Sequence, residues 1–177
     1  MEPNAEKLNL LIPHTEIIAR VKELADDLSK DYTGKPLLMI AVLKGAFPFL
    51  ADITRALTIP AHVDFISVSS YDGTKPCNDL KYHLEPVGDI EGKHVVIIED
   101  IIDTGRTIAS IVEKIQGYGA LDVKICTLFK RESTNKEILH ADYVGFTIKD
   151  GFVVGYGLDH NEDYRTLNDI YTLNCPD

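Results

Sequence analysis

Tryptophan is absent from this chain, and cysteine is scarce, with three residues among 177. Cys77, Cys126 and Cys175 are widely spaced and odd in number, and no two of them form a CxxC pair. A disulfide framework or a zinc site needs paired or clustered cysteines. The cysteine pattern therefore favours a reducing, cytoplasmic setting.

Long apolar runs are also missing. The strongest run, which includes Ile40 to Leu43, is stopped by Lys44, far short of the ~20 residues that a membrane-spanning helix needs. The first ten residues, MEPNAEKLNL, lack the basic start and the apolar block of a secretory signal peptide. We therefore expect no membrane partner and no signal peptide.

Basic residues are outnumbered, with 18 Lys and Arg against 28 Asp and Glu and a formal net charge of −10. Nonspecific nucleic-acid binding needs a basic surface, so we expect no nucleic-acid partner. Exposed charges more than ~8 Å apart are largely screened at physiological salt. Local Lys, Arg, backbone N–H groups and a divalent cation can therefore still bind a polyphosphate on this acidic chain.

Apolar segments alternate with amphipathic ones along the chain. The continuous apolar runs at 37–43 and 95–100 are typical of strands buried on both faces. Thr15 is expected to cap the first helix, and the polar segment 70–79 is the most loop-like. Further strands are expected at 62–69, 122–129, 141–148 and 152–159, and helices at 15–28, 49–57 and 108–115. This alternation predicts an α/β fold with a central parallel sheet flanked by helices, in one domain.

The most informative stretch is Val95 to Ile108, which reads VVIIEDIIDTGRTI. An apolar strand runs into two adjacent carboxylates, Glu99 and Asp100, and a polar loop at 103–107 then leads into a helix. A loop that feeds a helix N-terminus presents unpaired backbone N–H groups and the positive end of the helix dipole. The loop therefore predicts an anion-binding site beside the acidic pair.

The residues within this loop favour a phosphate attached to a sugar. Gly105 lets the backbone approach a ligand closely, and Thr104 and Thr107 add hydroxyl donors. The neighbouring carboxylates suit the hydroxyl groups of a sugar. We therefore expect this strand, loop and helix to form a sugar-phosphate site.

The stretch resembles the phosphoribosyl-pyrophosphate signature of the type I phosphoribosyltransferases, in particular their hypoxanthine-guanine branch. The resemblance spans about Leu37 to Arg165 and includes LKG at 43–45 and FVVGYGLD at 152–159. It implies the type I phosphoribosyltransferase fold, with a core at about 37–160 and a small hood built from the two chain ends. It also implies a homodimer or homotetramer that transfers 5-phosphoribose from phosphoribosyl pyrophosphate to hypoxanthine or guanine, with Mg²⁺.

The resemblance assigns the sugar-phosphate groups and the catalytic residue. It implies that Glu99 and Asp100 hold the ribose hydroxyls and contribute to metal binding, and that Asp103 exchanges a proton with purine N7. A positioned carboxylate contributes roughly 10²–10⁴-fold to such a proton transfer, which accompanies an oxocarbenium-like state. The alternative is that Asp103 only caps the helix, because Asp is a favoured N-cap residue. The 5′-phosphate is assigned to Thr104, Gly105, Arg106 and Thr107.

The resemblance also assigns the base-binding residues and a closing loop. It implies that Lys130 donates to the exocyclic oxygen of a 6-oxopurine, which disfavours adenine because its amino group is itself a donor. Phe152 would stack on the purine, and the backbone of Val153 would read its edge. Ser70 and Tyr71 match the mobile loop that closes over the site and excludes water.

The remaining assignments concern pyrophosphate. The resemblance places Lys44 and Gly45 in the pyrophosphate turn, often with a cis peptide before the lysine. It implies that Asp159 coordinates the Mg²⁺ ion on pyrophosphate and that Arg165 contacts the same group. Mg²⁺ prefers oxygen ligands from one or two carboxylates and substrate phosphates, which agrees with this set.

Three alternatives remain open on the sequence. A regulatory protein with this fold would sense phosphoribosyl pyrophosphate and bind nucleic acid, although the acidic balance disfavours it. An enzyme of the same fold would act on xanthine or adenine; Lys130 opposes adenine but hardly separates xanthine from guanine. A generic nucleotide-binding α/β protein lacks support, because the chain has no Walker A or GxGxxG motif.

Overall fold

The computed structural model describes residues 7–72, 75–132, 140–149 and 151–174. In chain order its elements are β1 (Lys7–Ile12), α1 (His14–Asp31), β2 (Leu37–Leu43), α2 (Phe47–Ala56), β3 (His62–Asp72), β4 (Lys75–Leu84), β5 (His94–Ile102), α3 (Arg106–Gly117), β6 (Asp122–Arg131), β7 (Tyr143–Ile148), β8 (Phe152–Val154) and β9 (Ile170–Asn174). None of the helices in these ranges is both long and apolar enough to cross a membrane.

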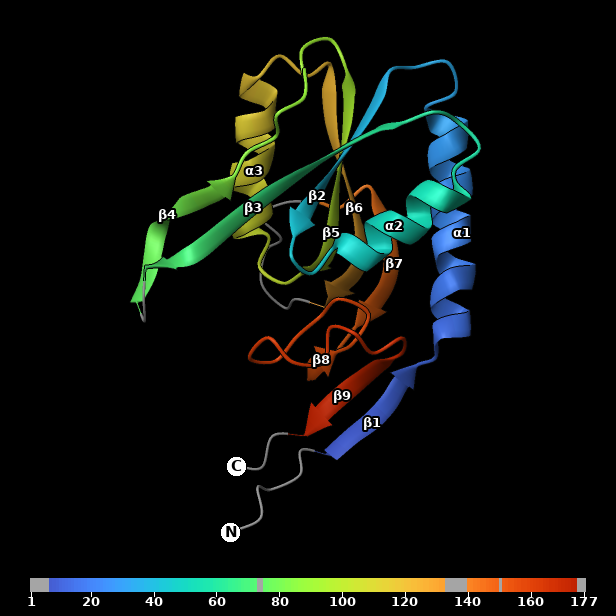
Figure 1. Cartoon of the computed structure of the whole chain (residues 1–177), viewed down its shortest axis with the longest axis vertical. Coiled ribbons are helices and arrows are strands. Elements are labelled where there is room, and N and C mark those ends of the chain that lie inside the picture. Colours follow the sequence, from blue (N-terminus) through green and yellow to red (C-terminus); the bar gives the residue numbers. More distant parts are fainter. Residues whose placement is uncertain (1–6, 73–74, 133–139, 150, 175–177) are drawn as a thin grey trace.

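The central sheet has the strand order β4-β3-β2-β5-β6-β7. Its strands are parallel except at the β4 edge, where β4 runs antiparallel to β3. Helices α1 and α2 lie on one side of this sheet and α3 on the other (Figure 1). The prediction of an α/β fold with a parallel sheet between helices is confirmed.

Alternate residues of the central strands enter two separate cores. In β2, Met39 and Ala41 join the cluster that includes α1 and α2, whereas Ile40 and Val42 join the cluster around α3. Successive side chains of a strand point to opposite faces of a sheet, so both faces of β2 must be apolar. This explains why the run at 37–43 is continuously hydrophobic.

A second, antiparallel sheet joins the two ends of the chain in the order β1-β9-β8 (Figure 1). The segment at 152–159 was expected to be one more strand of the core, and this prediction was wrong. Strand β8 stops at Val154, and Gly155, Tyr156 and Gly157 then adopt φ values of 101°, 46° and 99°. Extended backbone requires negative φ, so the chain turns here instead of continuing as a strand.

The segment at 70–79, expected to be a loop, lies mostly in a β-hairpin. Strand β3 continues to Asp72 and β4 begins at Lys75. The hairpin projects beyond the body of the sheet (Figure 1). Cross-strand pairs such as Val68 with Tyr82 supply backbone hydrogen bonds that outweigh the weak strand propensity of this polar segment.

Helix α1 begins one residue earlier than expected and is not capped by Thr15. Pro13 occupies the N-cap position, with no side-chain capping bond. The backbone N–H of His14 instead donates to Oδ1 of Asp169 at 2.7 Å. A residue just before β9 therefore satisfies a helix-terminal donor that a local side chain would otherwise bind.

Candidate active site

The carboxyl ends of three neighbouring parallel strands bring the predicted site residues to one edge of the central sheet. Lys44 directly follows β2, the loop at 103–107 follows β5, and Lys130 is the penultimate residue of β6. The register pairs the Cα of Ile102 with that of Lys130, so the last two of these segments are adjacent. This edge is where open parallel sheets bind ligands.

The loop after β5 forms a hollow at the start of α3. Gly105 is the N-cap residue, with a left-handed φ of 75° that a residue with a Cβ adopts at a cost. The first-turn N–H groups of α3 have no carbonyl within the helix to bind, so they are available to a ligand at this end of the helix. It encloses about 380 Å³ of space open to solvent and is lined by Glu99, Ile101, Ile102, Asp103, Thr104, Gly105, Arg106, Thr107 and Ile108.

Glu99 and Asp100 are fixed by neighbouring backbone N–H groups. The N–H of Asp100 donates to Oε1 of Glu99 at 3.1 Å, and the N–H of Ile101 donates to Oδ1 of Asp100 at 2.8 Å. Burial, and then the negative charge of Asp100, raise the pKa of Glu99 well above its ordinary value. The site thus holds two adjacent carboxyl groups, of which Glu99 is buried and Asp100 is more exposed, and their oxygens are suited to bind hydroxyl groups.

Gly45 packs directly on this acidic pair. A Cβ at position 45 would lie 1.6 Å from Oδ2 of Asp100, so no larger residue fits without moving the carboxylate. A Cβ at Gly157 would in turn lie 2.1 Å from the carbonyl oxygen of Gly45. The Leu43–Lys44 peptide bond is cis. The turn after β2 is thus enclosed between β5 and the turn that follows β8.

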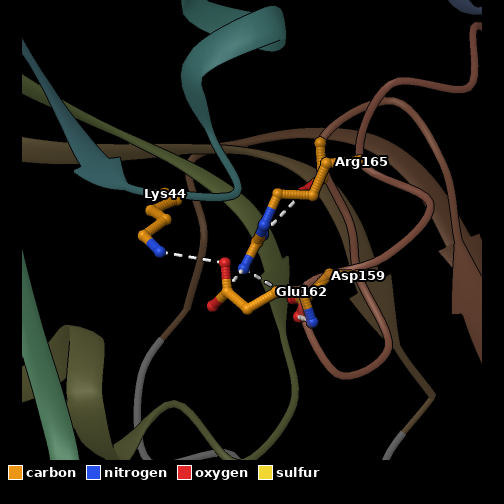
Figure 2. Close-up of polar contacts among 5 residues, drawn as sticks. Lys44, Asp159, Glu162 and Arg165 are labelled. Carbon is orange, nitrogen blue, oxygen red and sulfur yellow. Dashed lines mark hydrogen bonds and ion pairs between the residues drawn. The ribbon is translucent and has the colours of Figure 1, made fainter.

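Four charged residues form a network beside this turn (Figure 2). Nζ of Lys44 lies 2.9 Å from Oε2 of Glu162, and one terminal nitrogen of Arg165 lies 2.8 Å from Oδ1 of Asp159 and 3.5 Å from Oε1 of Glu162. The hydrogen bond from Lys44 and the charge of Arg165 lower the pKa of Glu162. Two cations therefore face the same region from opposite segments of the chain.

Most of the chain matches a known family. The family model described as "Phosphoribosyl transferase domain" matches residues 11–161. The chain is 41% identical over 170 residues to a hypoxanthine-guanine phosphoribosyltransferase of Lactococcus lactis, covering 94% of this chain and 92% of the relative. It is 40% identical over 165 residues to the protein of that name from Streptococcus pneumoniae, covering 93% and 92%. The chain belongs to the phosphoribosyltransferase family.

A solved relative confirms the phosphoribosyltransferase fold. The crystal structure of a hypoxanthine phosphoribosyltransferase from Staphylococcus aureus superposes with a TM-score of 0.88 at 40% identity, covering 94% of this chain and 91% of that one. The predicted resemblance to type I phosphoribosyltransferases is therefore confirmed for the family and for the fold.

The expected base-binding residues of this phosphoribosyltransferase come from two sheets. Lys130 lies on β6 in the central sheet, whereas Phe152 and Val153 lie on β8 in the small sheet. The Phe152 side chain is 44% exposed, whereas Val153 is buried. The ring of His160 lies edge-on to Phe152, with centroids 5.1 Å apart. An exposed aromatic ring at this position has a face available to a planar ligand.

The expected closing residues Ser70 and Tyr71 lie near the end of β3. Their backbone belongs to the hairpin, in which Tyr71 is paired with Pro76. Their side chains lie outside the described part of the chain. Their proposed role in closing this phosphoribosyltransferase over its substrates therefore stays a prediction.

Two features of the site were missed in the sequence. Glu162 stands between Asp159 and Arg165 in the run DHNEDYR, and its acidic side chain was the only signal available. The second feature is Tyr156, whose side chain is only 4% exposed. Its hydroxyl also donates to Oδ2 of Asp52 on α2 at 2.6 Å, which ties the turn after β8 to the helix after the Lys44 turn.

Proposed function

We propose that this protein transfers the 5-phosphoribosyl group from phosphoribosyl pyrophosphate to hypoxanthine or guanine and releases pyrophosphate. The observation that carries the proposal is the packing of Gly45 on Asp100, beside the loop at 103–107. This packing brings the turn with the Lys44 cation, the acidic pair and the predicted anion-binding loop into one site. Phosphoribosyl pyrophosphate carries a pyrophosphate, a diol and a phosphate in this order. The relatives that share most of the chain bear the name of this activity.

The phosphate and ribose would be held mainly by the strand-loop-helix unit. Backbone N–H groups at the start of α3 and the hydroxyls of Thr104 and Thr107 would donate to the 5′-phosphate, with the helix dipole favouring its charge. Arg106 is exposed at the first position of α3 and would add a cation. Glu99 and Asp100 would bind the ribose hydroxyls, fixing the anomeric carbon between base and leaving group.

Asp103 would accept the proton that the purine loses. As the purine nitrogen bonds to the anomeric carbon, the bond from that carbon to the pyrophosphate oxygen breaks. Positive charge then develops on the ribose ring, as it does on the sugar ring in glycoside hydrolysis. Asp103 is exposed at the mouth of the hollow. A carboxylate at this position neutralises developing charge on the purine, which favours nucleophilic attack.

The purine would lie between the two sheets. Lys130 would donate to the oxygen at position 6, and the exposed ring of Phe152 would stack on the base, with the backbone of Val153 at its edge. In this proposal the β1-β9-β8 sheet is the hood, so β8 belongs to the hood although it lies within the expected core range of 37–160. Xanthine shares the oxygen at position 6, so Lys130 selects against adenine rather than between the oxopurines.

Pyrophosphate would be bound by Lys44, Arg165 and a Mg²⁺ ion. The described residues contain no group of three or more His, Cys, Asp or Glu side chains that could hold a metal by themselves. Asp159, with Glu99 and Asp100 on the ribose side, supplies carboxylate oxygens, and Mg²⁺ commonly takes one or two of these together with substrate phosphates. The donor set therefore fits an ion that arrives with the substrate. When bound, the ion would neutralise charge on the departing pyrophosphate.

The experiment is a transferase assay with phosphoribosyl pyrophosphate and Mg²⁺, in which hypoxanthine, guanine, xanthine and adenine are offered separately. Nucleotide and pyrophosphate are quantified together, with EDTA as the control for the metal. We expect metal-dependent product from hypoxanthine or guanine and none from adenine. Binding of phosphoribosyl pyrophosphate without any product would instead support the regulatory alternative. The homo-oligomer and the cytoplasmic location stay predictions, the first being tested by light scattering over a broad concentration range.

A further inference from the structure

Glu162 places its carboxylate between the two cations assigned to pyrophosphate. Oε2 lies 2.9 Å from Nζ of Lys44, and Oε1 lies 3.5 Å from Arg165 (Figure 2). Lys44 follows β2, whereas Arg165 lies more than a hundred residues later. Each oxygen of one carboxylate thus faces a different cation, as two oxygens of an anionic ligand would.

The backbone around Glu162 holds this carboxylate in place. His160 and Asp163 exchange two backbone hydrogen bonds, of 3.2 Å and 3.0 Å, around Asn161 and Glu162. Asn161 and Glu162 have φ values of 53° and 69°. This is the pattern of a two-residue type I′ turn, whose second position favours glycine. A glutamate in left-handed conformation is uncommon, and its presence here points to a use for its side chain.

The same turn also engages Asp159. The backbone N–H of Glu162 donates to Oδ2 of Asp159 at 2.9 Å, while Oδ1 of Asp159 is paired with Arg165 at 2.8 Å. Both oxygens of the expected metal ligand therefore have protein partners in this conformation.

We propose that Glu162 is an internal competitor for the pyrophosphate site: its carboxylate binds Lys44 and Arg165 until the pyrophosphate group of substrate or product displaces it. This inference rests on the proposed function, which assigns these two cations to pyrophosphate. Glu162 then sets the affinity of the site. It weakens pyrophosphate binding, and it replaces the departing product at cations that would otherwise hold it.

The expected effect of Glu162 on pyrophosphate affinity is small because its ion pair with Lys44 is exposed to solvent. The side chains of Lys44 and Glu162 are each 65% exposed, and ion pairs in such surroundings contribute little to stability. Displacement by a multiply charged anion is therefore easy. We expect Glu162→Gln to bind pyrophosphate roughly two- to fivefold more tightly, in line with the small value of exposed ion pairs.

The test compares the unsubstituted protein with Glu162→Gln and with Asp163→Asn, which removes the same charge from the same exposed turn. Binding of pyrophosphate, with and without Mg²⁺, is measured by calorimetry, and KM and kcat are measured for both substrates. Glu162→Gln is expected to lower the dissociation constant of pyrophosphate and the KM of phosphoribosyl pyrophosphate by the same two- to fivefold, with the KM of hypoxanthine unchanged. Asp163→Asn is expected to leave all of these close to the unsubstituted values.

Unchanged or weaker pyrophosphate binding in Glu162→Gln would overturn the inference, and weaker binding would show that Glu162 orients the two cations instead. An equal gain in Asp163→Asn would also overturn it, because the effect would then come from net charge alone. If nucleotide is still formed in these cases, the proposed function stands and only the role of Glu162 fails. If the unsubstituted protein neither binds pyrophosphate nor forms nucleotide, both fail together.

Discussion

Gly45 lies against the carboxylate of Asp100 so closely that a Cβ at position 45 would be 1.6 Å from Oδ2. The contact couples the turn after β2 to the acidic end of β5. In the proposed reaction, these two segments bind the leaving group and the ribose. Their relative position therefore decides whether the anomeric carbon and pyrophosphate are correctly aligned.

Gly45→Ala is expected to lower kcat/KM by roughly 10²-fold or more, because the added methyl group must displace Asp100 or the Lys44 turn. Steady-state kinetics with both substrates measures the loss. Gly117→Ala is the matched control, since a Cβ at that position in α3 meets nothing within 4 Å. Thermal unfolding of both variants separates a local effect on the site from a loss of fold. A Gly45→Ala protein with full activity would show that the turn adjusts freely, contrary to this packing.

Asp103→Asn is expected to lower kcat by about 10²–10⁴-fold, because the amide cannot accept the purine proton. The affinity for phosphoribosyl pyrophosphate should change little, since the phosphate is held by the loop backbone and hydroxyls. Calorimetry of substrate binding and steady-state kinetics test the two halves of this statement. Full activity in Asp103→Asn would end the catalytic assignment and leave Asp103 as a residue of the loop alone.

Lys130→Ala is expected to raise the KM for hypoxanthine and guanine roughly tenfold or more, because a hydrogen bond from a charged donor contributes about 1.5–3 kcal/mol. Lys124→Ala is the control from the same strand. Lys124 lies near the opposite end of β6, 3.8 Å from Asp142, and its loss should leave both constants unchanged. Inhibition by adenine of the reaction with hypoxanthine provides a second measurement of base selectivity. Equal KM values in Lys130→Ala and the unsubstituted protein would remove Lys130 from base recognition.

Local patterns in the sequence were sufficient to predict the parallel strands of the central sheet and the loop after β5, but not the edge strand β4. The runs at 37–43 and 95–100 are apolar on both faces because the strands are covered on both faces. A continuous apolar run therefore indicates by itself that its strand is central in the sheet. The segment at 103–107 also depends on neighbouring residues alone, since Gly105 caps helix α3, which begins at Arg106. These features depend on residues that are neighbours in the chain.

Other features depend on residues far apart in the sequence, and these were missed. Asp169 binds the first N–H group of α1 from the other end of the chain, so no local pattern could show that Thr15 is not the cap. Glu162 stands out only because it forms an ion pair with Lys44. A motif read along the sequence does not show that these two residues are in contact. The run at 152–159 was interpreted as a strand because its apolar residues suit one. Its two glycines, at 155 and 157, instead form a turn.

Tyr156 connects the stability of this turn to pH. Burial, and then the hydrogen bond to Asp52, raise the pKa of its phenol above the ordinary value of 10.0. The folded protein therefore keeps the proton at a pH where the unfolded chain releases it. The stabilising contribution is complete below pH ~10 and is lost as the pH rises toward the folded-state pKa, because ionisation then favours the unfolded chain.

Tyr156→Phe is therefore expected to reduce the steepness with which the free energy of unfolding falls above pH ~10. Near pH ~7 the variant should be less stable by about 1 kcal/mol, the typical net value of one hydrogen bond, since Asp52 loses its donor. Urea unfolding at a series of pH values measures both effects. Tyr32 and Tyr143 also have raised pKa values, so the variant should retain part of the slope. A decline as steep as in the unsubstituted protein would show that Tyr156 ionises alike in the folded and unfolded chains, and that its bond to Asp52 does not hold the proton.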